Sequence, residues 1–196
     1  MSQTAWSNIG ILSSIAYVCG YCNNTVATDR GYQSGQKIEG NIAKILVCPH
    51  CFKPTFLHGN VPTPGLSPGR PVQNVPPLLH DLYDEARRCS SVSAYTAAVL
   101  ACRKLLMNIA VTNGAKEGQP FVSYVQYLAD NHYVPPNGRA WVDHIRKKGN
   151  EATHEISPMG KGDAEELITF AEMLLKFIYE FPARVPPAVA AAEASA

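Results

Sequence analysis

Apolar residues recur at helical spacing over most of the chain after residue 77. The repeat of three or four positions, which marks one face of an α-helix, runs through five segments: 78–89, 94–112, 121–129, 139–155 and 163–181. Residues typical of helix starts accompany them, such as Pro120 before the third segment and Asp163 at the beginning of the fifth. Five helices joined by short loops favour an antiparallel bundle.

The first sixty residues show short β-rich runs in place of helical periodicity. Residues 42–47 form one such run, and residues 55–57 can pair beyond it. Residues 61–77 carry six of the fifteen prolines, which favour an extended backbone. We therefore predict a mainly α fold in four parts: a small β ribbon over 1–60, a linker over 61–77, a helical bundle over 78–182 and a disordered tail over 183–196.

Composition places the chain among globular proteins, because 46% of its 196 residues are hydrophobic and 17% are charged. The formal net charge of +1 says nothing global about a nucleic-acid partner. The apolar run Ile9–Val18 has no Lys or Arg before it and is too short to span a bilayer. We expect no membrane contact and a cytoplasmic location.

Four of the six cysteines stand in two C-x-x-C pairs, Cys19 with Cys22 and Cys48 with Cys51. Two such turns can place four thiolates around one ion, which is the closed tetrahedral shell of a structural zinc site. The alternative is a redox pair, but that chemistry needs only one C-x-x-C and normally a βαβ setting. We predict bound Zn²⁺ with a structural role, and we interpret His50, inside the second pair, as a bystander.

Aromatic and basic residues are interleaved along the ribbon. They are Tyr21, Arg30, Tyr32, Lys37, Lys44 and Lys53. Such a surface suits base stacking and phosphate contact, so it favours binding of RNA or of another protein. The alternative interpretation is the ordinary exposed surface of a small module.

Residues 145–156 combine helical spacing with polar residues that a packing helix does not need. Arg146, Asn150 and His154 stand at i, i+4 and i+8, away from the apolar stripe of the same helix. Imidazole can take and give a proton near neutrality, and guanidinium suits a phosphate, so the three side chains suit phosphodiester cleavage. The alternative is a surface helix with scattered charges and a capping histidine.

Further lysines extend this basic region. We predict that Lys147, Lys148 and Lys161 contact phosphates. Lys161 lies in a Gly-Lys-Gly sequence just before a helix, where backbone N–H groups can hold an anion. The same sequence is equally typical of a tight loop between helices.

The stretch 145–154, followed by an acidic helix rich in Leu and Phe, resembles the bacterial domain-of-unknown-function 4145 family. The resemblance extends back over residues 79–86 and 97–106 and covers about 77–183. Members often carry a cysteine ribbon in front and often occur beside restriction or other anti-phage systems. Their fold is grouped with the HEPN (higher eukaryotes and prokaryotes nucleotide-binding) helical bundles, so the resemblance implies a HEPN-like bundle here.

Many HEPN proteins are metal-independent endoribonucleases that dimerise to bring two Arg…His motifs together. Their usual spacing is shorter than the seven residues between Arg146 and His154, whereas five residues separate Lys148 from His154. The resemblance therefore implies a homodimer or higher homo-oligomer in which Lys148 is the alternative cation to Arg146.

Two functions follow as hypotheses. The first is a ribonuclease of anti-phage defence, with His154 as general base or acid, Arg146 or Lys148 stabilising phosphoryl charge, and Asn150 orienting the phosphate. A phage or regulatory protein would trigger it. The second is a non-catalytic module that binds protein or nucleic acid through the ribbon and the bundle, with the polar stripe in a dimer interface.

Overall fold

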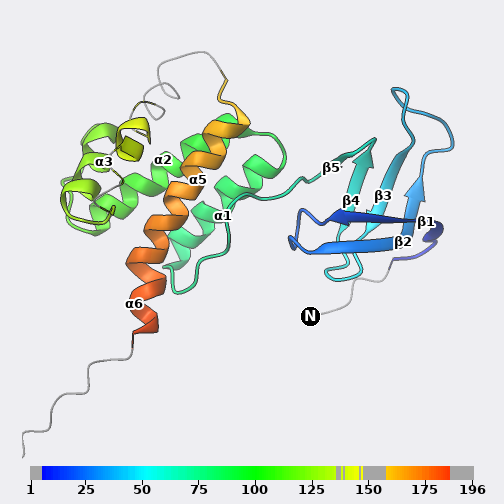
Figure 1. Cartoon of the computed structure of the whole chain (residues 1–196), viewed down its shortest axis with the longest axis horizontal. Coiled ribbons are helices and arrows are strands. Elements are labelled where there is room, and N and C mark those ends of the chain that lie inside the picture. Colours follow the sequence, from blue (N-terminus) through cyan, green and yellow to red (C-terminus); the bar gives the residue numbers. More distant parts are fainter. Residues whose placement is uncertain (1–5, 136–137, 139, 146, 148–157, 186–196) are drawn as a thin grey trace, which may run out of the picture.

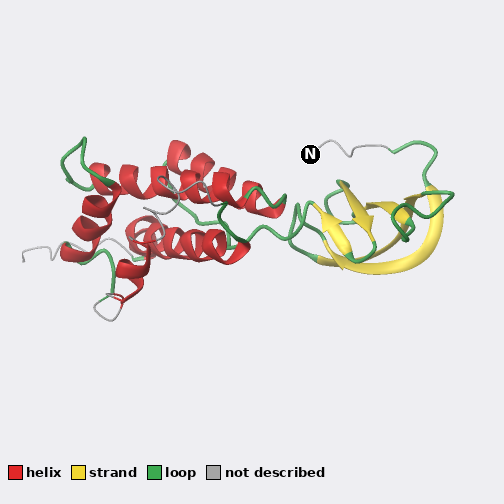
Figure 2. Ribbon diagram, turned by 90° about the horizontal axis from the view of Figure 1, so that it is seen from above, coloured by secondary structure: helices red, strands yellow, loops and turns green. Residues whose placement is uncertain are grey.

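The computed structural model describes residues 6–135, 138, 140–145, 147 and 158–185. It contains a β-sheet at the N-terminal end and a helical unit after it, and Figures 1 and 2 show the two side by side, joined by an extended segment. The sheet has five strands in sequential order, each antiparallel to the next. They are β1 (Gly10–Val18), β2 (Thr25–Gln33), β3 (Ala43–Val47), β4 (Pro54–His58) and β5 (Val61–Thr63).

The predicted fold class, mainly α with a small ribbon before a five-helix HEPN-like bundle, is wrong. Of the described residues, 45% are helical and 20% lie in strands, so the sheet is a substantial part of the fold. The error comes from the first hairpin, in which β1 and β2 have nine residues each. The run Ile9–Val18, which we considered only as a membrane segment, contains β1. Its pairing with β2 forms a strand that its mixed composition does not predict.

The sheet has one buried and one more open face. Cross-strand partners share a face, so the neighbours Gly31, Leu46 and Thr55 stand together, and all three are buried. The next row, shifted by one residue, faces the other side and holds Ile45 and Phe56, which are exposed. Thr28, Ala43 and Val47 belong to the same face as Ile45 and Phe56 but are buried, so that face is open only in part.

The helical unit packs its apolar faces into one core. Its elements are α1 (Pro77–Ser91), α2 (Tyr95–Thr112), α3 (Phe121–Asp130), α5 (Lys161–Leu175), a π-helical turn (Lys176–Glu180) and α6 (Phe181–Arg184). Residues 140–145 are also helical, and Ile145 within them is fully buried. Trp141 meets Phe170 of α5 edge to face, with ring centroids 5.0 Å apart. Among the described residues, no helix is both long enough and apolar enough to cross a membrane.

Residues 65–75, which we call the strap, are bound to the helical unit by side chains. Arg87 of α1 donates from Nε to the carbonyl of Pro68 at 2.9 Å. Glu172 of α5 accepts from the backbone N–H of Arg70 at 3.0 Å, and Glu180 of the π-helical turn accepts from that of Gln73 at 3.0 Å. These bonds satisfy backbone groups that an irregular segment would otherwise leave to water, and they hold the strap against the bundle.

Candidate metal centre and adjoining cleft

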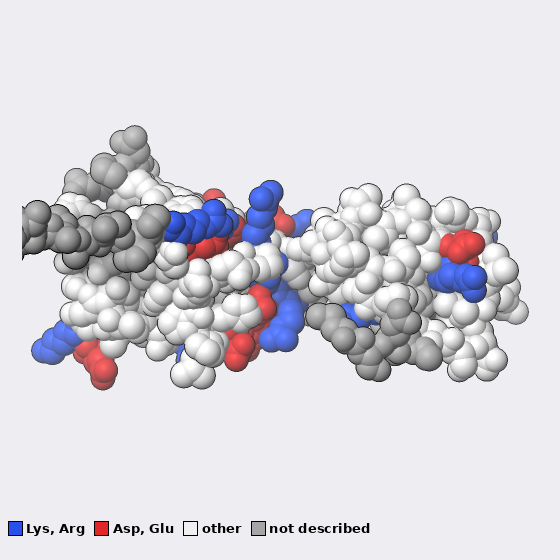
Figure 3. Space-filling model, turned by 90° about the horizontal axis from the view of Figure 1, so that it is seen from below, with Lys and Arg blue, Asp and Glu red and all other residues white. Residues whose placement is uncertain are grey.

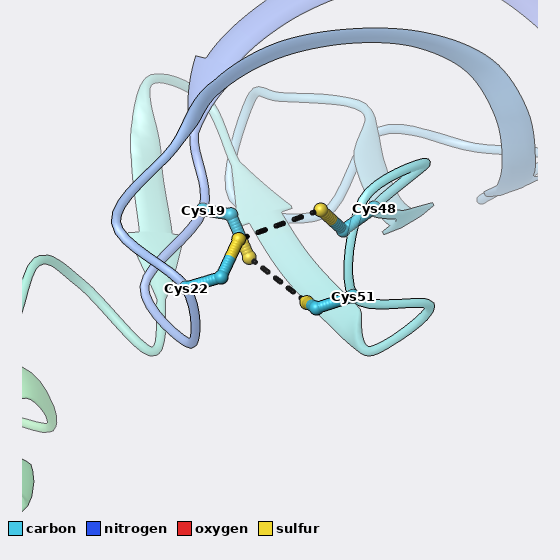
Figure 4. A group of neighbouring side chains, drawn as sticks. All are labelled: Cys19, Cys22, Cys48 and Cys51. Atoms are coloured by element: carbon cyan, nitrogen blue, oxygen red, sulfur yellow. Dashed lines mark hydrogen bonds between the residues drawn. The ribbon is translucent and has the colours of Figure 1, made fainter. Parts of the chain in front are cut away.

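The four cysteines of the two C-x-x-C turns meet at one end of the sheet, where Figure 4 shows their sulfur atoms pointing toward one another. The Sγ atoms of Cys19 and Cys51 are 3.7 Å apart, those of Cys22 and Cys48 are 3.8 Å apart, and all four lie within 4.8 Å. A tetrahedron with Zn–S bonds of about 2.3 Å has edges of about 3.8 Å. The donor set and its spacing therefore fit a zinc ion, as the sequence predicted.

Both turns have the same backbone construction. In the first, the N–H of Cys19 donates to the carbonyl of Asn24 at 3.0 Å, and the N–H of Asn23 donates to the carbonyl of Cys19 at 2.8 Å. In the second, Cys48 donates to Lys53 at 3.1 Å, and the residue four positions after Cys48 donates back at 2.9 Å. The repeated geometry explains why the spacing alone predicted the site.

The fourth position after the first cysteine takes a left-handed backbone in each turn. Asn23 has φ of 55°, which asparagine tolerates, and Phe52 has φ of 59°, which is uncommon for a bulky side chain. The carbonyl of Phe52 accepts from the indole N–H of Trp6 at 2.9 Å. The N-terminal segment therefore contacts the second turn where its backbone is strained.

Backbone N–H groups point at the sulfurs and favour thiolates. Burial raises the pKa of Cys22, but hydrogen bonds from the backbone of Asn24 and from Cys19 lower it to about 6 overall. Burial raises the pKa of Cys51 to about 12, although the backbone of Lys53 opposes that shift. Cysteine sulfurs must lose their protons to bind a metal ion, so binding at this cluster would release protons.

Two contacts join the turns outside the sulfur cluster. The side-chain amide of Asn24 donates to Nδ1 of His50 at 3.1 Å. The ammonium group of Lys53 lies over the ring of Tyr21, 5.0 Å from its centroid. His50 is exposed and outside the sulfur group, so four sulfurs complete the shell. A closed shell leaves no position for substrate, so this centre would hold the turns together.

A cleft of about 900 Å³ lies between the first turn and the end of α1. Figure 3 shows Lys and Arg gathered where the two units meet. Tyr21 and Lys53 line the cleft from the sheet side, and Arg88 and Val92 line it from the side of the helical unit. Asp84 and Glu85 also line it, and Asp84 is paired with Arg87 at 2.8 Å.

The backbone of the metal-binding turn packs tightly against residues 64 and 65. A Cβ added at Gly20 would lie 2.3 Å from the carbonyl oxygens of Pro64 and Gly65, so only glycine fits there. The N–H of Gly65 donates to the carbonyl of Ser91, the last residue of α1, at 2.7 Å. The metal-binding turn therefore packs against the start of the strap, and the strap is hydrogen-bonded to the end of α1.

The predicted residues of the helical part fall in two groups. Arg146, Lys148, Asn150 and His154 lie outside the described residues. Lys147 is helical and exposed, and Lys161 is exposed in the first turn of α5. The Nζ atom of Lys161 lies 3.6 Å from Glu165 of its own helix.

Several residues of this region escaped the sequence analysis. Arg88 and Val92 line the same cleft as the metal-binding turn only because of the tertiary fold, and no local pattern identified them. His144, two positions before Arg146, lies with Nε2 2.7 Å from a carboxylate oxygen of Glu166. Both side chains of that pair are nearly half exposed, so it is a surface ion pair when the histidine is protonated.

Comparison with known proteins identifies one relationship. A family described as "Domain of unknown function (DUF4145)" matches residues 84–192, which include the second half of α1 and the described helices after it. No curated protein and no solved structure matches the chain. The match concerns the helical part, while the four cysteines lie before it.

Proposed function

We infer that this chain, which belongs to the DUF4145 family, binds single-stranded RNA in the cleft between its metal-centred sheet and its helical domain. The observation that carries this inference is the composition of the cleft wall. Tyr21 is 47% exposed, with the Lys53 ammonium over its ring, and the exposed Arg88 lies across the cleft. An aromatic ring with cations on both sides suits a base and its flanking phosphates.

The charges of the cleft favour a polyanion by a small margin. Lys53, Arg87 and Arg88 oppose Asp84 and Glu85, and the Arg87–Asp84 pair neutralises itself. The remaining charged side chains of the cleft are two cations, Lys53 and Arg88, and one carboxylate, Glu85. The zinc ion has a structural part in this function, because it fixes the turn that carries Tyr21 and is separated from solvent chemistry by its four sulfurs.

The test is fluorescence anisotropy of labelled single-stranded RNA with zinc-loaded protein over a range of salt concentrations. We expect Lys53→Gln combined with Arg88→Gln to weaken binding and to reduce the slope of log K against log salt by about 0.7 per lost phosphate contact. The matched control is Lys116→Gln, an exposed lysine between α2 and α3. Absence of binding by the wild type, or equal affinity and slope in the double variant, would refute the function.

A second candidate function is a metal-independent endoribonuclease of anti-phage defence, and one observation favours it. The helical residues 140–145, which precede the motif in the sequence, are anchored through Ile145, which is fully buried, and through Trp141 against α5. In this hypothesis His154 would act as general base, and Arg146 or Lys148 would stabilise the phosphoryl charge. Two copies would pair their motifs, and a phage or regulatory protein would act as the trigger.

Incubation with labelled RNA in EDTA, with zinc content measured in parallel, tests the second candidate. We expect 2′,3′-cyclic phosphate ends from the wild type and none from His154→Ala. His144→Ala is the matched control, since this histidine of the same region pairs with Glu166. Cleavage by His154→Ala would show that His154 is not the general base. RNA binding without cleavage by the wild type would refute the nuclease and agree with the first function, RNA binding in the cleft.

A further inference from the structure

The open face of the sheet carries a row of four neighbouring side chains, one from each of four strands. Tyr32 of β2 is opposite Ile45 of β3, Ile45 is opposite Phe56 of β4, and Phe56 is opposite Thr63 of β5. Ile45 is 40% exposed and Phe56 is 44% exposed, whereas the adjacent row on the other face is buried. We call Tyr32, Ile45, Phe56 and Thr63 the open row.

Aromatic rings on this face are held in place. The ring of Phe56 is nearly parallel to that of His58, with an interplanar angle of 13° and centroids 6.4 Å apart. Nε2 of His58 is 2.8 Å from the carbonyl oxygen of Ile38, and the hydroxyl of Tyr32 donates to the carbonyl of Ser7 at 2.6 Å. Phe56 therefore lies against a ring that a polar contact holds, and a preordered ring loses little freedom when another ring stacks on it.

The charge of the same face is positive. Arg30 is two positions before Tyr32 on β2 and shares its face, with 60% of its side chain exposed and Nε 3.7 Å from Asp29. Arg30 is the one charged side chain among the described strand residues of this face, because its neighbour Asp29 and Lys44 of β3 belong to the opposite face. A polyanion with flat rings matches these two properties together, whereas a second copy of this face would bring arginine against arginine.

We propose that the open row stacks the bases of single-stranded RNA, with Phe56 as the central platform and Arg30 at the phosphates. The proposal rests on the proposed RNA-binding function and adds a surface on the sheet, separate from the cleft residues Tyr21 and Lys53. Stacking requires only the flat face of a base, so this surface selects single strands without selecting sequence.

The experiment compares Phe56→Leu with Phe56→Trp in zinc-loaded full-length protein. Leucine keeps an apolar side chain and removes the ring, so we expect affinity for labelled single-stranded RNA to fall by about 5- to 100-fold. Tryptophan restores a ring, so we expect affinity within about threefold of the wild type. Leu100→Ala is the matched control, since Leu100 is 45% exposed on α2, and zinc content and thermal unfolding verify the fold.

The outcomes separate this proposal from the function on which it rests. No RNA binding by the wild type refutes the function, and the open row with it. Wild-type binding with unchanged affinity in Phe56→Leu refutes the open row alone and leaves the cleft. A wild-type dimer that becomes a monomer in Phe56→Leu at unchanged RNA affinity identifies the row as an interface between copies, and it overturns the proposal. Equal loss in Phe56→Leu and Phe56→Trp also overturns it, because stacking then has no part.

Discussion

Replacement of Gly20 by alanine tests how firmly the metal-binding turn is joined to the rest of the chain. Gly20 does not have a left-handed backbone, so alanine meets no conformational penalty there. The added Cβ, however, would lie 2.3 Å from the carbonyl oxygens of both Pro64 and Gly65. Backbone rather than a flexible side chain blocks it, and the segment must move by about 1 Å to restore ordinary contact distances.

The destabilisation follows from two contributions. Overpacking against a backbone that cannot yield locally costs about 1–3 kcal/mol. The displacement also weakens the 2.7 Å hydrogen bond from Gly65 to Ser91, which contributes about 1 kcal/mol. We expect Gly20→Ala to lower the free energy of unfolding by about 2–4 kcal/mol and the melting temperature by about 5–15 °C.

The assay is thermal unfolding of zinc-loaded protein, combined with zinc content and limited proteolysis of residues 64–75. Gly35→Ala is the matched control, because nothing lies within 4 Å of a Cβ at Gly35. We expect that control to be unchanged or more stable by up to about 1 kcal/mol, since alanine restricts the unfolded chain. Equal melting temperatures and equal protection of the strap in Gly20→Ala would show that the turn does not press on the strap.

Three further outcomes are expected. Cys48→Ser should abolish zinc binding and unfold the sheet while helical circular dichroism persists, whereas Cys89→Ala should keep the wild-type zinc content. Glu180→Ala should cost about 1–3 kcal/mol in urea unfolding because it leaves the N–H of Gln73 without its acceptor, and Glu180→Gln should cost less. Burial raises the pKa of Cys102 to about 12, so its contribution to stability is complete below about pH 9 and is lost as pH rises toward 12. Urea unfolding from pH 8 to 11 should show a decline that is smaller in Cys102→Ala, and equal declines would contradict the assignment.

The four-cysteine cluster was predictable because the pattern that identifies it is local. A C-x-x-C turn sets the direction of two sulfurs within a few residues, so the spacing was enough to identify Cys19, Cys22, Cys48 and Cys51 as one cluster. Helix periodicity is local as well. The segments predicted over 78–89 and 94–112 correspond to α1 and α2, and their bounds differ from the structure by one or two residues.

The sheet was not predictable in this way because its order depends on pairing between distant segments. β1 mixes Gly, Ser and Ala with apolar residues and shows no clear alternation, and its pairing with β2 contains an irregularity between Ile11 and Ile15. The cleft could not be predicted either, because Tyr21 and Arg88, which line it together, are far apart in the sequence. The motif of Arg146, Asn150 and His154 stays a prediction.

The attachment of the strap changes how the sheet and the helical domain can cooperate on one ligand. Two modules on a loose tether explore many separations, and the second contact is governed by an effective concentration that falls with tether length. Here the bonds from Arg87, Glu172 and Glu180 hold the connecting segment to the bundle, and Gly20 packs directly on its first residues. The two surfaces therefore stand at a set separation before any ligand arrives. A ligand long enough to reach both is bound with less loss of conformational entropy, and one too short or wrongly curved is rejected by geometry.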